Sequence, residues 1–218
     1  MRVLVIGANG KTGRRIVRQM HDGPHVPVAM VRDPGQQATF TSLDVESVVA
    51  DLEDGISEVL DGIEAVIFAA GSGSKTGPEK TIDVDQNGAI RSIDEAREAG
   101  VARYVMLSSM HADPESEGHR ISHYYRAKGI ADEHLRTRGP EHVIVRPGRL
   151  TDEMGRERVR IAPTIEGRGE VARDDVASVL IRCLDHPGVG GLSFDLLEGE
   201  VPIQEALDHL AAGRSRID

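Results

Sequence analysis

The sequence predicts a single α/β domain with a mainly parallel sheet that is covered by helices on both faces. Three observations predict this fold class: a length of 218 residues, short apolar segments alternating with amphipathic ones, and near-continuous apolar character within the short segments. Strands that are buried on both faces show this continuous apolar character. Alternation of strands and helices is typical of right-handed crossovers between parallel strands.

The expected elements can be placed along the chain in order. We expect strands at residues 3–6, 28–32, 45–50, 65–69, 104–108, 143–146 and 193–197. We expect helices at residues 10–20, 56–60, 81–99, 122–138, 174–185 and about 203–210. Residues 148–170 are rich in arginine and break the alternation. We interpret them as a small substrate-side insertion in one domain spanning residues 1–218, which ends in a small C-terminal cap.

The composition excludes several classes of protein. A net charge of −10 argues against nucleic-acid or membrane-surface partners, because their phosphates would be repelled. An aromatic content of 3% without tryptophan is too low for a base-stacking platform. The longest apolar runs, such as residues 65–70, are too short to span a bilayer. The single cysteine and the strand pattern at the start of the chain lead us to expect a cytoplasmic protein without a signal peptide. We expect it to bind a small-molecule substrate, and the sequence is also compatible with a homodimer.

A glycine-rich loop between the first strand and the first helix is the most informative motif. In the segment GANGKTG, Gly7 permits a tight turn, Gly10 lets the backbone approach a pyrophosphate, and Gly13 lets the helix lie close to the strand. The helix N-terminus then offers N–H groups to the phosphates. The phosphate-binding loop of nucleoside triphosphatases needs a glycine five residues before its Gly-Lys pair. Here that position, residue 5, is valine, so this type of loop is excluded. The motif predicts a doubly wound Rossmann fold whose dinucleotide contacts include Gly7, Asn9, Gly10, Lys11, Thr12 and Gly13.

The residue that follows the second strand bears on the choice of dinucleotide. NAD-binding sites usually carry an acidic residue there, but this chain carries Arg32, which suits the 2′-phosphate of NADP. Lys11 is expected to assist, while the adjacent Asp33 keeps NAD open. We therefore expect NADP as the cofactor. Further expected contacts, for which plain turns or capped loops are alternatives, are Asp51, Leu52, Ala69, Ala70, Gly71 and Pro147.

With its later motifs, the chain resembles the atypical short-chain dehydrogenase/reductases of the NmrA-like, NAD(P)-binding group. The matching segments cover nearly the whole length and are GANGKTG, Phe68-Ala-Ala-Gly71, Val105-Met-Leu-Ser-Ser109, Tyr124-Tyr-Arg-Ala-Lys128, Val145-Arg-Pro-Gly-Arg-Leu150 and Arg173-Asp-Asp-Val-Ala177.

The resemblance implies that Ser109, Tyr124 and Lys128 form a catalytic set. The tyrosine would act as general acid or base, the serine would orient the substrate oxygen, and the lysine would hold the nicotinamide ribose. A nearby ammonium lowers the pKa of a tyrosine. Spacing alone also allows a surface tyrosine and a solvated lysine on one face of an amphipathic helix. His111 could line the substrate pocket, and we expect no metal because the histidines show no zinc-binding motif.

One departure from the family pattern concerns the helix after the fourth strand. The extended enzymes often carry asparagine three residues before a glycine, but here Asp85 precedes Gly88 at that spacing. We expect an NADP(H)-binding oxidoreductase that reduces a small carbonyl or quinone-like substrate by hydride transfer. The alternatives are a non-catalytic NADP(H) redox sensor acting through a protein partner, and an epimerase or dehydratase with tightly bound cofactor.

Overall fold

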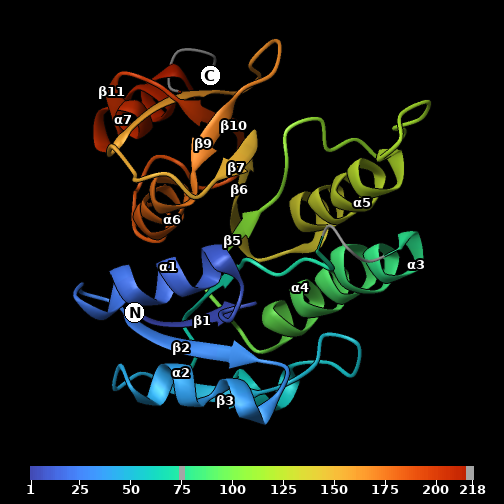
Figure 1. The fold of residues 1–218 in the computed structure, drawn as a ribbon, viewed down its shortest axis with the longest axis vertical. Helices are drawn as coiled ribbons and strands as arrows, with labels where there is room; N and C mark the ends of the chain where they lie inside the picture. Colours follow the sequence, from blue (N-terminus) through green and yellow to red (C-terminus); the bar gives the residue numbers. More distant parts are fainter. Residues whose placement is uncertain (74–76, 215–218) are drawn as a thin grey trace.

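In the computed structural model, which describes residues 1–73 and 77–214, a nine-stranded sheet forms the centre of the molecule (Figure 1). The strand order is β11-β8-β10-β6-β5-β4-β1-β2-β3. The parallel strands are β1 (Arg2–Ile6), β2 (Val26–Val31), β3 (Glu46–Val49), β4 (Ala65–Phe68), β5 (Arg103–Leu107), β6 (Glu141–Pro147) and β10 (Leu192–Glu198). This order confirms the predicted Rossmann fold, and all seven predicted strands appear.

Helices cover both faces of this sheet. They are α1 (Lys11–His21), α2 (Ala38–Thr41), α3 (Pro78–Thr81), α4 (Ala89–Glu98), α5 (Ser122–Arg138), α6 (Arg173–Arg182) and α7 (Ile203–Arg214). Alternate residues of the strands point to opposite faces. Val3 and Val5 of β1 belong to the apolar layer under α1 and α6, whereas Leu4 and Ile6 belong to the layer under α4 and α5. Figure 1 shows these two pairs of helices on opposite sides of the strands. The doubly buried strands explain the continuous apolar runs in the sequence.

Two predicted helices have a different form in the structure. The expected helix at residues 81–99 is divided into α3, a π-helical segment η3 (Ile82–Gly88) and α4. The expected helix at 56–60 is only a 3-10 turn, η2 (Ser57–Val59). Gly55 and Gly62, which flank this turn, have φ angles of 105° and 68°. Such left-handed conformations end a helix, so the turn cannot extend in either direction.

The arginine-rich segment 148–170 contributes strands that the sequence did not predict. β8 (Arg158–Ala162) pairs antiparallel with β10 and extends the main sheet, and β11 (Val201–Pro202) pairs with β8. β7 (Arg149–Thr151) and β9 (Glu170–Ala172) form a small parallel sheet of their own. In β8, Val159 is buried between the exposed Arg158 and Arg160, which is the period-two pattern of a strand with one solvated face. The sequence did not predict this strand because one of its faces is charged, whereas the predicted strands are apolar on both faces.

Candidate functional site

The glycine-rich loop closes tightly against the end of β4. Gly7 has a φ of 80°, and a Cβ atom there would lie 2.7 Å from the backbone of Ala70. A Cβ on Gly13 would lie 2.2 Å from the carbonyl oxygen of Gly7, which also accepts a hydrogen bond from the Gly10 N–H at 2.9 Å. The first and third glycines therefore satisfy close backbone approaches, and the start of α1 lies at the carboxyl ends of the strands.

A cleft of about 440 Å³ opens at this edge of the sheet. It lies where the ends of β1, β2, β3 and β4 meet, beyond the carboxyl ends of the strands, where ligands bind in open α/β sheets. Of the predicted cofactor contacts, the cleft is lined by Gly7, Asn9, Gly10, Arg32, Asp51, Leu52, Ala70 and Gly71. The sequence analysis missed further lining residues, namely Ile6, Met30, Val31, Gln36, Ala50, Ser72, Lys80 and Val84.

Other predicted cofactor contacts lie outside this lining. The ammonium of Lys11 pairs with Asp152, which follows β7. Thr12 is buried in the first turn of α1. The Ala69 N–H donates to the carbonyl oxygen of Ile6 at 2.9 Å. The remaining three residues of this group are Gly13, Lys128 and Pro147.

Charged side chains gather at the end of the cleft near β2. The guanidinium of Arg32 is exposed, and Lys80 of α3 lines the same cleft. Lys80 pairs with Glu53, and this hydrogen bond raises the lysine pKa, while the positive charge of Arg32 acts to lower it. The carboxylate of Asp33 turns to its own loop, where it accepts the Gly35 N–H at 2.8 Å. This end of the cleft therefore carries two cations, of which Lys80 is paired with Glu53, and the carboxylate of Asp51 lines the same cleft.

The three residues of the predicted catalytic set lie close together at the ends of β4 and β5. Tyr124 and Lys128 lie one turn apart on α5. Lys128 is buried, so the alternative of a solvated surface lysine is wrong. Its Nζ atom lies 3.1 Å from Oδ1 of Asp85, 3.5 Å from the carbonyl oxygen of Leu107 and 5.5 Å from the centre of the Phe68 ring. Tyr124 is half-buried, and Ser109 lies near enough to act on its pKa, which it lowers. The Ser109 hydroxyl donates to the Met110 carbonyl oxygen at 3.1 Å.

A close contact between α5 and the preceding loop positions Ser109 relative to Tyr124. A Cβ atom on Gly129 would lie 2.3 Å from the carbonyl carbon of Asp113, so only glycine permits this approach. The Asp113 N–H donates to the carbonyl oxygen of Tyr125 at 3.1 Å. The loop that follows β5 is thus held on the first turns of α5.

Opposing effects act on the ionisable groups of this set. Burial raises the pKa of Tyr124; Lys128 lowers it and Asp85 raises it, and the result is a raised pKa. Burial acts to lower the pKa of Lys128, but the neighbouring Asp85 and Tyr124 outweigh burial and raise it. A buried ammonium is tolerated here because it has a carboxylate partner.

A second buried ion pair lies one turn further along α5. Asp132 is fully buried and accepts hydrogen bonds from Nη2 and Nε of Arg146 at 2.8 and 2.9 Å. Burial raises the pKa of Asp132, and Arg146 opposes that shift. The inner face of α5 therefore carries a phenol, an ammonium and a carboxylate at successive turns.

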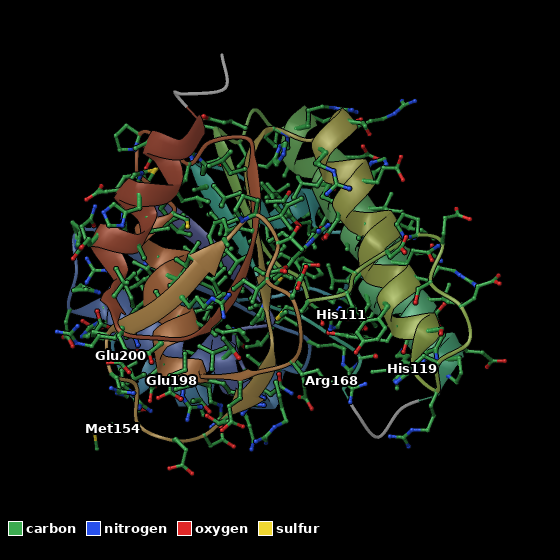
Figure 2. The ribbon with its side chains drawn as sticks, turned by 90° about the horizontal axis from the view of Figure 1, so that it is seen from above. His111, His119, Met154, Arg168, Glu198 and Glu200 are labelled. Carbon is green, nitrogen blue, oxygen red and sulfur yellow. The ribbon has the colours of Figure 1, made fainter. Side chains whose placement is uncertain are left out.

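Aromatic rings lie beside Tyr124 at the open rim. The ring of Tyr125 lies 5.8 Å from His111, 6.0 Å from His119 and 5.9 Å from Tyr124. Ile165 packs against Met110, so the loop of residues 163–169 lies against the segment that carries His111. Figure 2 shows His111, His119 and Arg168 at this rim, with Met154, Glu198 and Glu200 on the other side of the molecule.

Three further features of the described residues bear on metal, membrane and thiol chemistry. Across residues 1–73 and 77–214, no three histidine, cysteine or acidic side chains are grouped as metal ligands. In the same ranges, no helix combines the length and apolar character that a membrane span requires. Cys183 is buried, and burial raises the pKa of its thiol to about 12.

Comparison with known proteins agrees with this geometry. Residues 7–187 match the model of the NAD(P)H-binding family, and the chain belongs to that family. It is 41% identical over 215 residues to the uncharacterized sugar epimerase YhfK of Bacillus subtilis, covering 96% of this chain and all of that protein. A candidate NAD-dependent epimerase/dehydratase from Bacillus halodurans superposes with a TM-score of 0.92 at 38% identity, covering 96% of this chain and all of the other. The oxidoreductase ylbE from Lactococcus lactis gives a TM-score of 0.85 at 25% identity, covering 97% of each chain.

These findings confirm the resemblance to the NmrA-like, atypical short-chain dehydrogenase/reductases. They support an NAD(P)H-binding fold of the oxidoreductase type and do not distinguish between the two dinucleotides.

Proposed function

We propose that this protein is an NADP(H)-dependent oxidoreductase that reduces a small carbonyl or quinone-like substrate. The observation that carries the proposal is that the dinucleotide cleft adjoins the set of Ser109, Tyr124 and Lys128. Asp85 links the two: a Cβ on Gly71, which lines the cleft, would lie 3.1 Å from its Oδ1 atom, and the same atom contacts Lys128. A cofactor in the cleft would thus lie beside a proton donor.

The reductive step follows from these positions. NADPH, when bound, supplies a hydride to the substrate carbon. The Tyr124 hydroxyl gives its proton to the carbonyl oxygen, so that one hydride and one proton together form the alcohol. The Ser109 hydroxyl orients the same oxygen, and Lys128 keeps the Tyr124 side of α5 in place through its contacts with Asp85 and Leu107.

The choice of NADP(H) rests on the charged end of the cleft. Arg32 and Lys80 line it together, which suits a ribose that carries a 2′-phosphate. Asp33, the group that would favour NAD, is engaged with the Gly35 N–H. A bound phosphate would compete with Glu53 for the ammonium of Lys80.

The test is a fluorescence titration with NADPH and NADH, followed by a carbonyl and quinone panel with the dinucleotide that binds more tightly. We expect NADPH to bind at least about tenfold more tightly, which corresponds to about 1.4 kcal/mol. We also expect consumption of NADPH with at least one member of the panel. Equal affinity for NADH would contradict the choice of cofactor, and an inert panel together with an unreactive bound cofactor would contradict the reduction.

The descriptions of the relatives from the two Bacillus species favour a second candidate, an epimerase or dehydratase that keeps its cofactor bound. In such an enzyme the dinucleotide is oxidised and reduced within one turnover, so it is not consumed. Denaturation would release bound NADP from the purified protein, and a substrate would be converted without a change in absorbance at 340 nm. Stoichiometric loss of NADPH with a carbonyl substrate would contradict this candidate.

A further inference from the structure

We propose that Asp85 is a positioning residue: its negative charge offsets the positive charge of the Lys128 ammonium and thereby keeps the Tyr124 hydroxyl protonated. The site is then set to donate a proton, as carbonyl reduction requires, and not to remove one from an alcohol. The reductive sense of this inference rests on the proposed function. The protonation of Tyr124 itself is a property of the protein alone.

The geometry of the ion pair supports this role. Nζ of Lys128 and Oδ1 of Asp85 are 3.1 Å apart, and the two side chains are only 4% and 1% exposed. The other carboxylate oxygen of Asp85 accepts the Ser72 N–H at 2.9 Å, which fixes the orientation of the carboxylate. Two charges this close and this far from water interact much more strongly than a surface pair.

The π-helical segment brings Asp85 to this place. Asp85 lies in the middle of η3, between α3 and α4, and η3 packs against α5. A π-helical hydrogen bond spans one more residue than an α-helical one, and this shifts the direction of the side chains that follow. Short π-helical segments of this kind are frequent at functional sites.

The neighbouring charges also balance. On α5, Lys128 faces Tyr124 and Asp132, and Asp132 is paired with Arg146 of β6. From β5 the Leu107 carbonyl oxygen and from β4 the Phe68 ring face the ammonium.

Two ionic groups of the helices beside α5 are paired away from Tyr124. On α3, Lys80 is paired with Glu53, and on α4, Asp94 is paired with His134 near the C-terminal end of α5. The inner cluster thus contains two cations and two carboxylates. At Tyr124 the positive charge of Lys128 acts more strongly than the negative charge of Asp85, which offsets it in part.

A neutral side chain at position 85 would have a different effect. An asparagine there, as the family pattern often has, would leave the Lys128 ammonium unopposed, and its field would favour the phenolate of Tyr124. The effects on the pKa of Tyr124 agree with this account: burial raises the pKa, Lys128 lowers it, and Asp85 acts against Lys128.

The protein offers a clean optical test, because it has three tyrosines and no tryptophan. Tyr104 is fully buried and hydrogen-bonded to Ser92, and burial raises its pKa beyond the range of a titration of the folded protein. In a Tyr125→Phe background, tyrosinate absorbance near 295 nm then reports on Tyr124. The Tyr124→Phe/Tyr125→Phe protein is the blank. Circular dichroism at each pH confirms that the protein is folded.

In this background we expect Asp85→Asn to lower the titration midpoint of Tyr124 by about 1 to 2 pH units, because the ammonium is no longer matched. An unchanged midpoint in the folded variant would overturn the proposal and would leave Asp85 as a purely structural partner of Lys128.

Asp85→Asn leaves a buried ammonium without its partner, so this variant can fail to fold. The double variant Asp85→Asn/Lys128→Met removes both charges and decides the matter in that case. A midpoint that rises by less than about 1 pH unit, or that falls, supports the proposal, because Asp85 then offsets most of the effect of Lys128. A rise of about 1 pH unit or more would overturn it, because Lys128 would then dominate in the parent. The titration needs neither cofactor nor substrate, so its failure is distinguishable from a failure of the proposed function.

Discussion

Two lysines in and near the cleft have opposite surroundings. Near β2, Lys80 is 35% exposed, pairs with Glu53 and lies beside the exposed Arg32, so an incoming anion can still reach both cations. Outside the lining of the cleft, Lys128 is 4% exposed and is paired with Asp85. The ammonium is thus accessible to a ligand in the first place and is a fixed internal charge in the second.

The difference teaches that burial, more than residue type, decides what a lysine does in this protein. An exposed ammonium is hydrated and gains from a phosphate only moderately, whereas a buried one must be paired for the protein to fold. Each of the following changes is directed either at the phosphate end of the cleft or at the neighbouring set of Ser109, Tyr124 and Lys128, and is expected to leave the other region intact.

The largest effect is expected from Tyr124→Phe. Loss of the proton donor should reduce kcat for carbonyl reduction by about 10²- to 10⁴-fold, with NADPH affinity changed by less than about twofold because the phosphate end is untouched. Steady-state kinetics and cofactor titration measure the two. Tyr104→Phe, which removes a hydroxyl bonded to Ser92 in the core, is the matched control and should keep its kcat. Unimpaired turnover in Tyr124→Phe would show that another group donates the proton.

The next effect concerns the pH dependence of reduction. Tyr124 can donate only while it is protonated, so the rate should be constant below its pKa and fall as the pH rises through it. Because burial raises that pKa above its ordinary value near 10, kcat should be flat from about pH 6 to about pH 9. A pH–rate profile that declines already near neutrality would show that Lys128 dominates over burial and Asp85.

A smaller effect is expected from Arg32→Ala at the opposite end. It should lower the affinity for NADPH by about tenfold, through loss of a charge-assisted contact with the phosphate, and leave NADH affinity nearly unchanged. Arg18→Ala removes an exposed arginine of α1 that does not line the cleft, and it is the matched control. An equal loss for both dinucleotides would indicate that Arg32 does not recognise the 2′-phosphate.

The smallest effects separate Lys80 from Lys11. Lys80→Ala should weaken NADPH binding by about two- to fivefold, because Glu53 already holds part of its charge. Lys11→Ala should change it by less than about twofold, since that ammonium faces Asp152. Titrations at low and moderate salt measure both changes. A larger loss in Lys11→Ala than in Lys80→Ala would reverse this assignment.

Much of the fold could be predicted from local patterns. The spacing of the glycines and the doubly buried strands identified the parallel sheet and the cleft, because these features depend on residues that are neighbours in sequence. β8 escaped prediction because its exposed arginines hide its period of two. Lys80 and Gln36 escaped because no motif links them to the glycine loop, and only the folded chain brings them to its end of the sheet.

The sequence by itself determined the class of the fold and the dinucleotide loop, and its resemblance to the family predicted the set of Ser109, Tyr124 and Lys128. It also identified Asp85 as a departure from the family pattern, without its consequence. Only the tertiary structure decided that Lys128 is buried, that Asp85 is its partner, and that Asp33 faces its own loop. The physical reason is that ionic interactions depend on distance and on exposure to water, and both are set by the packing of η3 against α5, segments that are far apart in the sequence.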